Sequence, residues 1–295
     1  MWYYNKQKKI KKKLGEGCFL ISIYRKTNLK LGWTVQLMFK INLHQKDMDL
    51  LKNIKDYFGV GRISKHGSDS IQYHVHSVKD LQIIVSHFYK FNLITQKRVD
   101  YELWKKAFNL IINKEHLTME GLQKIVAIRA SLNRGLSPEL ESVFSNITPI
   151  DRPLIATGPK ISDSSWLAGF ASAEGSFTVK TVNSASCLTG VQVYLRFQLT
   201  QHSRDEQLIK SLREYFGCGA VHPDRDTFNF LVTKFSDIRS KIIPFFAEYP
   251  VQGVKFKDYL DWCKAAELIE NKDHLTQKGL DQIRKIKDGM NTGRV

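Results

Sequence analysis

The sequence has little negative charge for its length. Its 295 residues include 29 Asp and Glu but 45 Lys and Arg, which gives a formal net charge of +16 at pH 7. This balance is unlike that of an ordinary near-neutral globular protein. It indicates a polyanionic partner, either nucleic acid or an anionic membrane surface.

Long hydrophobic runs are also lacking. Mostly apolar stretches, such as Leu81–Val85, are far shorter than the roughly 18 residues that a membrane-spanning helix needs. The Lys-rich amino terminus precedes no apolar signal segment. We therefore expect no membrane partner, and nucleic acid is the favoured polyanion.

Cysteine is scarce, and its four residues are scattered. Cys18, Cys187, Cys218 and Cys263 show neither a CxxC motif nor a Cys/His spacing typical of zinc sites. The pattern favours neither a disulfide framework nor a structural zinc site, and a reducing compartment is the simpler interpretation.

Proline is rare except in one segment. Four of the seven prolines, Pro138, Pro149, Pro153 and Pro159, fall between Leu136 and Lys160. Such a segment is typical of a linker. We predict a first repeat over residues 1–135, a linker over 136–163 and a second repeat over 164–295, which suits two domains of about 150 residues each.

The two halves of the chain repeat one pattern at a constant spacing of 158 positions. Tyr57-Phe58-Gly59 matches Tyr215-Phe216-Gly217, and His116-Leu117-Thr118 matches His274-Leu275-Thr276. Two copies of one fold in one chain predict a monomer with an internal pseudo-dimer. Chemistry at the seam between the copies should then occur twice, related by an approximate two-fold axis.

Each half contains the same predicted order of strands and helices. Apolar residues at every second position over 35–41 and 191–199 indicate half-buried strands. We predict a strand after Phe19, shorter strands near 62–65, 71–76, 219–222 and 228–233, and helices over 48–58, 100–113, 206–216 and 258–270. Thr118 and Thr276 are predicted N-caps of last helices that stop before Gly135 and Gly293. The expected fold class is therefore α+β, with an antiparallel sheet whose one face is polar.

The segment Leu167-Ala168-Gly169-Phe170-Ala171-Ser172-Ala173-Glu174-Gly175 opens the second half. Gly169 and Ala173 lie on one helical face, so another helix can approach closely, and Glu174 then falls at the helix end. Two such helices would bring two carboxylates together. Carboxylate oxygens are the ligands that a hard cation such as Mg²⁺ prefers.

This nonapeptide resembles the LAGLIDADG motif of homing endonucleases, specifically the single-chain, two-motif group encoded in organellar introns. The resemblance implies two αββαββα units whose sheets form a saddle over duplex DNA. It also implies one metal-binding acidic residue per motif, which are Glu16 and Glu174 here, with Gly15 and Ala173 beside them as further candidate metal ligands. The resemblance further implies basic residues that organise the attacking water or stabilise the scissile phosphate, and Lys97 and Lys255, which match between the halves, are the candidates.

The function implied by the resemblance is Mg²⁺-dependent cleavage of both strands of a long, imperfectly palindromic DNA site. The implied location is the mitochondrion or the chloroplast. We expect DNA contacts from polar side chains on the predicted strands and turns. The candidates in the first half are Ser22, Tyr24, Lys26, Thr34, Gln36, Lys40, Arg62, Lys65, Gln72 and His74. Those in the second half are Thr178, Lys180, Gln192, Tyr194, Arg196, Gln198, Thr200, His222, Arg225 and Asn229.

The first motif departs from the family pattern. It keeps Gly15-Glu16-Gly17, but the preceding positions are Lys-rich, and Lys11 stands where the second half has Gly169. A lysine does not fit where a glycine allows two helices to touch. Two alternatives therefore stay open beside the nuclease: an RNA maturase that assists splicing of its own intron, and a DNA-binding homologue with impaired cleavage.

Overall fold

The computed structural model describes residues 17–153, 161 and 163–294. Its described residues divide into two compact units, one formed by residues 17–153 and the other by residues 161 and 163–294. The two units repeat one arrangement of strands and helices.

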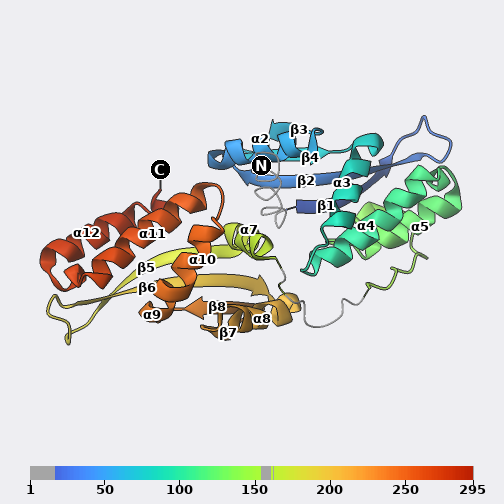
Figure 1. Cartoon of the computed structure of the whole chain (residues 1–295). Helices are drawn as coiled ribbons and strands as arrows, with labels where there is room; N and C mark the ends of the chain where they lie inside the picture. Colours follow the sequence, from blue (N-terminus) through green and yellow to red (C-terminus); the bar gives the residue numbers. More distant parts are fainter. Residues whose placement is uncertain (1–16, 154–160, 162, 295) are drawn as a thin grey trace. The chain divides into compact units, whose positions relative to one another are not determined.

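The first unit is built on a four-stranded antiparallel sheet with strand order β1-β2-β4-β3 (Figure 1). The strands are β1 (Gly17–Arg25), β2 (Trp33–His44), β3 (Arg62–Lys65) and β4 (Ser70–Val75). Its helices are α2 (Met48–Phe58), α3 (Val78–Lys90), α4 (Lys97–Ile112) and α5 (Met119–Ala130). Short 3-10 turns over Gln45–Asp47 and Glu115–Leu117 precede α2 and α5.

Aromatic side chains join this sheet to its helices. Phe19 on β1 lies 5.3 Å from Phe39 on β2, 5.2 Å from Phe88 on α3 and 5.5 Å from Trp104 on α4, measured between ring centroids. All four side chains are at most 1% exposed. The alternation of buried and accessible residues along β1 and β2 thus turns one sheet face toward the helices and leaves the other face polar.

The second unit repeats this design with strand order β5-β6-β8-β7. Its strands are β5 (Gly175–Asn183), β6 (Val191–His202), β7 (Ala220–Asp224) and β8 (Thr227–Val232). Helix α7 (Ser164–Glu174) precedes β5, and a 3-10 turn (Ser203–Asp205) leads into α8 (Glu206–Phe216). The segment α9 (Phe235–Asp237), a π-helical turn (Ile238–Ile242) and α10 (Ile243–Glu248) stand where the first unit has α3.

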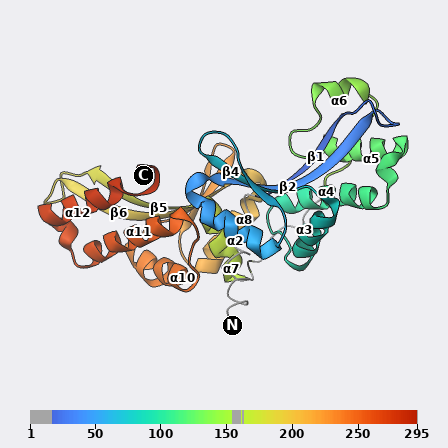
Figure 2. The same ribbon diagram turned by 90° about the horizontal axis from the view of Figure 1, so that it is seen from above.

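Two long helices complete the second unit. Helix α11 (Val254–Glu270) and helix α12 (Gln277–Asp288) lie side by side along β5 and β6 (Figures 1 and 2). A 3-10 turn (Asp273–Leu275) connects them, and another (Asn291–Gly293) follows α12. Two four-stranded antiparallel sheets with their helices confirm the predicted α+β class, while the helix expected before β1 lies outside the described residues.

The predicted helix caps are present. Thr118 accepts a hydrogen bond from the backbone N–H of Gly121, and Thr276 accepts one from Gly279, each at 3.1 Å. Both hydroxyl groups satisfy a backbone donor that has no partner inside the helix.

The repeat extends to the hydrogen bonds inside each unit. The indole Nε1 of Trp104 donates to the carbonyl of Leu20 at 3.1 Å, and Trp262 donates to Thr178 at 3.2 Å. Asn133 and Asn291, both with φ of 54°, donate from Nδ2 to the carbonyls of Phe19 and Phe177. These matched contacts fix the last helices of each unit against its first strand.

Part of the predicted linker is ordered against the first unit. Helix α6 (Pro138–Val143) places Glu139 3.0 Å from Arg25 on β1. Leu140 and Phe144 join a buried cluster with Leu122 and Val126 of α5. Residues 138–144 are therefore part of the packing of the first unit.

In the described part of the chain, no helix has the length and apolar character needed to cross a membrane.

Candidate nucleic-acid interface and catalytic site

Helix α7 holds Glu174 at its carboxyl end. The side chain of Asp163 caps the amino end by accepting from the backbone N–H of Ser165 at 2.8 Å. Residues 167–172 are all buried, whereas the Glu174 side chain is half-buried. The helix therefore presents its last carboxylate to the surroundings while the preceding turns stay packed.

Gly175 is required at the turn from α7 into β5 for a steric reason. Its φ of −81° is ordinary, so the turn does not need the conformational freedom of glycine. A Cβ atom at this position would lie 2.5 Å from the carbonyl oxygen of Ala171. Only glycine lets the strand leave the helix directly after Glu174.

Lys255 lies beside Glu174 in the fold although the two are 81 positions apart in the sequence. Its Nζ donates to the carbonyl oxygen of Ala173 at 3.1 Å and also to the carbonyl oxygen of Gly175. These two carbonyls flank Glu174 in the chain. The first turn of α11 thus places a positive charge next to the predicted acidic ligand.

Lys97 occupies the matching place in the first unit. It is the first residue of α4, and its charge acts on Cys18 near the start of β1. Burial raises the pKa of the Cys18 thiol, and the positive charges of Lys97 and Lys40 oppose that rise. Each matched lysine therefore lies near the start of the first strand of its own unit, while Glu16 and Gly15 lie outside the described residues.

The donor atoms near Glu174 fit a hard divalent cation. A carboxylate and the backbone carbonyl of Ala173 offer oxygen ligands, which Mg²⁺ and Ca²⁺ prefer. Over residues 17–153 and 163–294, no three His, Cys, Asp or Glu side chains gather at a spacing that would hold a metal ion.

The polar face of the first sheet is arranged in rows across the strands. One row holds Cys18, Lys40, His74 and Arg62, which pair in register from β1 through β2 and β4 to β3. Burial lowers the pKa of His74, and the nearby His76 and Arg62 lower it further. This row is rich in groups that donate to phosphates or guanine.

Further rows on this face hold most of the other predicted contacts. Ser22 pairs with Gln36, Tyr24 pairs with Thr34, and Gln72 lies opposite Asn42. Lys65 differs, because it pairs with buried Ile71 and so points to the opposite face from Arg62. Lys26 lies in the turn after β1.

The second sheet repeats the rows with different side chains. Thr178 pairs with Arg196, Lys180 with Tyr194, and Gln192 with Val182. Further along the face, Thr200, Asn229 and His222 form one row. Arg225 lies in the turn between β7 and β8 with φ of 52°.

A hydrogen-bonded group fixes part of this face. The Nε2 of Gln198 donates to Thr200 Oγ1 at 3.0 Å and to Asn229 Oδ1 at 2.9 Å, and the Thr200 hydroxyl donates to the same oxygen at 2.5 Å. Asn229 is 7% exposed. The three side chains are thus held in place before any ligand binds.

The sequence prediction missed several residues on these faces. β2 and β6 continue to His44 and His202, past the predicted strand ends. The period-two pattern does include Leu43, the next apolar position after Ile41, so it contained the signal for the longer β2. The missed residues whose register places them on the polar faces include Cys18, Leu20, Met38, Asn42, His44, Ser64, Ser70, Ser176, His202, Asp224 and Thr227.

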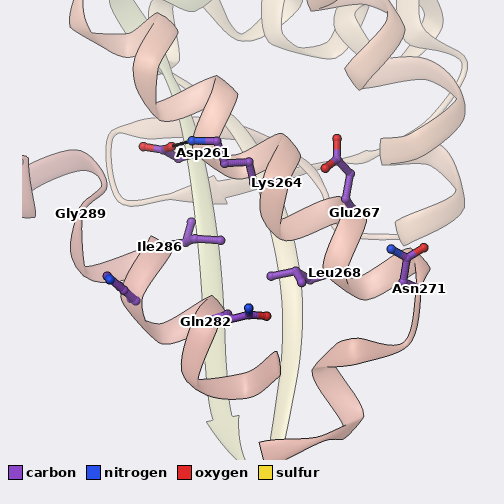
Figure 3. A pocket seen from close by; sticks show the side chains of 9 residues that line it. Asp261, Lys264, Glu267, Leu268, Asn271, Gln282, Ile286 and Gly289 are labelled. Carbon is purple, nitrogen blue, oxygen red and sulfur yellow. Dashed lines mark hydrogen bonds and ion pairs between the residues drawn. The ribbon is translucent and has the colours of Figure 1, made fainter. Parts of the chain in front are cut away.

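A pocket of about 520 Å³ lies elsewhere, between α11 and α12 (Figure 3). Asp261, Lys264 and Leu268 line it from α11, and Gln282 and Ile286 line it from α12. None of the predicted site residues lines this pocket, so it is separate from the candidate site.

The fold and the candidate site define a two-repeat α+β protein with an acidic residue at a helix end and a polar face on each sheet. A family model described as LAGLIDADG endonuclease matches residues 15–108 and again residues 167–266. The chain belongs to the LAGLIDADG endonuclease family.

Two fungal relatives match most of the chain. "Probable intron-encoded endonuclease 3" of Neurospora crassa is 41% identical over 273 residues, which cover 91% of this chain and 51% of the relative. "Probable intron-encoded endonuclease 2" of the same fungus is 39% identical over 289 residues, which cover 93% of this chain and 62% of the relative. The chain thus spans between half and two thirds of the length of these relatives.

A solved structure matches along its whole length. The I-SmaMI LAGLIDADG homing endonuclease bound to cleaved DNA is 43% identical with a TM-score of 0.93, covering 100% of this chain and 97% of that chain. A second structure shows I-SmaMI bound to its uncleaved DNA target in the presence of calcium ions, with a TM-score of 0.92.

Proposed function

We propose that this chain is a sequence-specific DNA homing endonuclease that hydrolyses both strands of a long, imperfectly palindromic duplex site. The observation that carries the proposal is the placement of Glu174 at the end of α7, with the Lys255 ammonium on the two flanking carbonyls. Likeness over the full chain to a DNA-bound homing endonuclease supports it.

Glu174 and the carbonyl of Ala173 are the proposed ligands of a divalent cation, and Mg²⁺ is the proposed metal. Glu16 and Gly15 are the proposed ligands from the first repeat. A cation bound there lowers the pKa of a water and neutralises charge on the phosphate. Lys255 keeps a positive charge beside Glu174, where it can orient water or stabilise the negative charge that develops on the scissile phosphate. Lys97 is proposed to do the same in the first repeat.

The proposed partner is double-stranded DNA bound by the polar sheet faces of one chain acting as a monomer. The net charge of +16 supports phosphate binding, and the rows of polar side chains supply donors and acceptors for base edges. The proposed repeats are residues 1–135 and 164–295, with residues 138–152 of the linker held on the first repeat by α6 and by the Arg152–Asp100 ion pair. We also propose a mitochondrial intron as the source, because the matching relatives are intron-encoded proteins of a fungus.

The test begins with a library of randomised duplexes incubated with the purified chain and Mg²⁺. We expect cleaved products that share one preferred site, and we expect Glu174→Gln to abolish cleavage while binding to that site persists. Glu214→Gln, which changes an exposed glutamate on α8, is the matched control and should cleave normally. Binding without any cleavage by the unchanged chain, or stimulation of intron splicing that tolerates Glu174→Gln, would contradict the nuclease and favour the two alternatives.

A further inference from the structure

Arg196 occupies a position at which the two repeats carry chemically different side chains. It lies in the middle of β6, paired with Thr178 of β5 on the polar face. Its neighbours along the strand, Leu195 and Phe197, are 1% and 0% exposed on the opposite face. The sheet therefore fixes the direction in which the Arg196 side chain leaves the backbone.

The guanidinium group of Arg196 is not committed to an acidic partner. Its Nε is buried and has no hydrogen-bond partner within residues 17–153 and 163–294. A buried donor without a partner is costly, so a movement of the side chain that brings this group to an acceptor on a ligand is favoured. Arginine presents a planar fork of donors, which matches the O6 and N7 acceptors of guanine.

The neighbouring side chains Gln198 and Thr178 on this face already form hydrogen bonds within the protein. Gln198 already donates to Thr200 and Asn229, and Thr178 Oγ1 lies 3.1 Å from Ser176 Oγ in a hydrogen bond. These groups are engaged with one another. In the centre of β6, Arg196 is thus the side chain whose paired donors are still available to bind a base.

The matching row of the first sheet is apolar. At the spacing of 158 positions, Thr178 corresponds to Leu20 and Arg196 to Met38, and Leu20 and Met38 pair with each other in register. Both side chains are half-buried on the polar face. Apolar side chains discriminate in the major groove by contact with the thymine methyl group.

We propose that Arg196 reads a guanine in the second half-site and that Leu20 with Met38 contacts a thymine at the corresponding position of the first half-site. This inference rests on the proposed DNA-binding function. The target is therefore asymmetric at this pair of positions even though the two repeats share one fold. Adjacent rows are two residues apart, about 6.8 Å, which corresponds to about two base-pair steps.

The test measures base preference position by position in the site selected by the unchanged chain. All single base-pair changes are made in that site, and duplex affinity is measured for the unchanged chain, Arg196→Met, Arg196→Lys and Met38→Arg. Arg196→Met places in the second repeat the residue that the first repeat already accommodates, so the fold should tolerate it. Arg213→Met, at an exposed position of α8, is the control and should leave the preference unchanged.

We expect the unchanged chain to prefer guanine at one base pair of the second half-site by roughly 5- to 150-fold. Arg196→Met should remove that preference and keep the preferences elsewhere, and Arg196→Lys should weaken it because lysine lacks the fork. Met38→Arg should replace a preference for thymine in the first half-site by one for guanine.

Two results would overturn the inference. One is an Arg196→Met variant that loses affinity equally for all sequences and shows a shallower salt dependence, which identifies a phosphate contact. The other is an unchanged base preference in Arg196→Met. Either result leaves the proposed nuclease intact as long as the unchanged chain binds and cleaves a preferred site, whereas a chain without any preferred duplex contradicts the proposed function itself.

Discussion

Lys255 donates a hydrogen bond from its ammonium group to the carbonyl oxygen of Ala173, 3.1 Å away. The contact connects the first turn of α11 to the last turn of α7, so the position of Glu174 depends on a helix that begins 80 residues later. Lysine is suited to this place because one ammonium group can donate to several carbonyls at once.

Lys255→Met should reduce cleavage far more than DNA binding. The substitution removes a charge beside Glu174 while keeping a long unbranched side chain, so we expect the single-turnover cleavage rate to fall on the order of 10²- to 10³-fold. Lys264→Met, on the same helix but with 63% of its side chain exposed, should cleave at the normal rate. Equal rates for Lys255→Met and Lys264→Met would show that Lys255 has no part in the reaction.

Gly175→Ala should displace the end of α7. The added Cβ atom would lie 2.5 Å from the carbonyl oxygen of Ala171, so helix or strand must shift and carry Glu174 with it. We expect loss of cleavage together with a lower midpoint of thermal unfolding. Gly289→Ala is the control, because its Cβ atom would come no closer than 3.6 Å to the carbonyl of Ile286. Normal cleavage by Gly175→Ala would contradict the steric explanation.

Asn133 should contribute to stability through both its side chain and its backbone conformation. Asn133→Gly removes the 2.9 Å hydrogen bond to the carbonyl of Phe19 and should lower the free energy of unfolding by about 1 kcal/mol. Asn133→Ala should cost about 1 kcal/mol more, because alanine disfavours the observed φ of 54°. Urea denaturation of the two variants separates the two contributions, and equal stability of Gly and Ala would exclude the backbone effect.

His74 should make the chain less stable as the solution becomes acidic. Burial and the nearby His76 and Arg62 lower its pKa in the folded chain, so the unfolded chain binds the proton first as the pH falls. The associated stability is complete above about pH 6.5, the ordinary histidine value, and declines as the pH falls through the lower folded pKa. His74→Gln should therefore lose less stability than the unchanged chain between pH 7.5 and 5.5 in urea denaturation.

A matched variant isolates this effect from other titrating groups. His66→Gln changes an exposed histidine in the turn after β3 and should leave the pH dependence of stability as it is in the unchanged chain. If His74→Gln and His66→Gln show the same slope as the unchanged chain, His74 does not carry the predicted effect.

Local pattern predicted the strands and the repeat well. Alternating residues such as Val35, Leu37 and Phe39 indicate β2 because one sheet face is buried and the other is polar. Helices α2 and α8 end at Gly59 and Gly217 as predicted, and both glycines adopt positive φ. These features depend on neighbours close in sequence, which is why sequence alone suffices.

The sequence pattern did not predict features that depend on contacts between residues far apart in the chain. Helix α4 begins at Lys97 and α11 at Val254, earlier than the predicted Asp100 and Asp258. The contacts of Lys255 with Ala173 and Gly175 stabilise that early turn, and sequence does not reveal them. For α3, the spacing of Leu81, Ile84, Val85 and Phe88 contains a helical signal that the sequence prediction did not use.

Part of the candidate site could also be predicted from the sequence. The motif indicates Glu174 and the repeat indicates Lys255, and in the structure the Lys255 ammonium donates to the carbonyls of Ala173 and Gly175, on either side of Glu174. Their roles in cleavage stay predictions. The row that joins Lys40, His74 and Arg62 required the strand register, because β3 and β4 pair through contacts that no local pattern specifies.

The matching aspartates of the two units form ion pairs with arginines from different parts of the chain. Asp100 is bound by Arg152, which follows α6, whereas Asp258 is bound by Arg294 after α12. A hybrid enzyme assembled from halves of two related proteins would therefore have to carry the first half through at least Arg152. A junction placed at residue 136, where the sequence suggests a boundary, would separate Asp100 from its counter-ion and strip α6 from the cluster around Leu122.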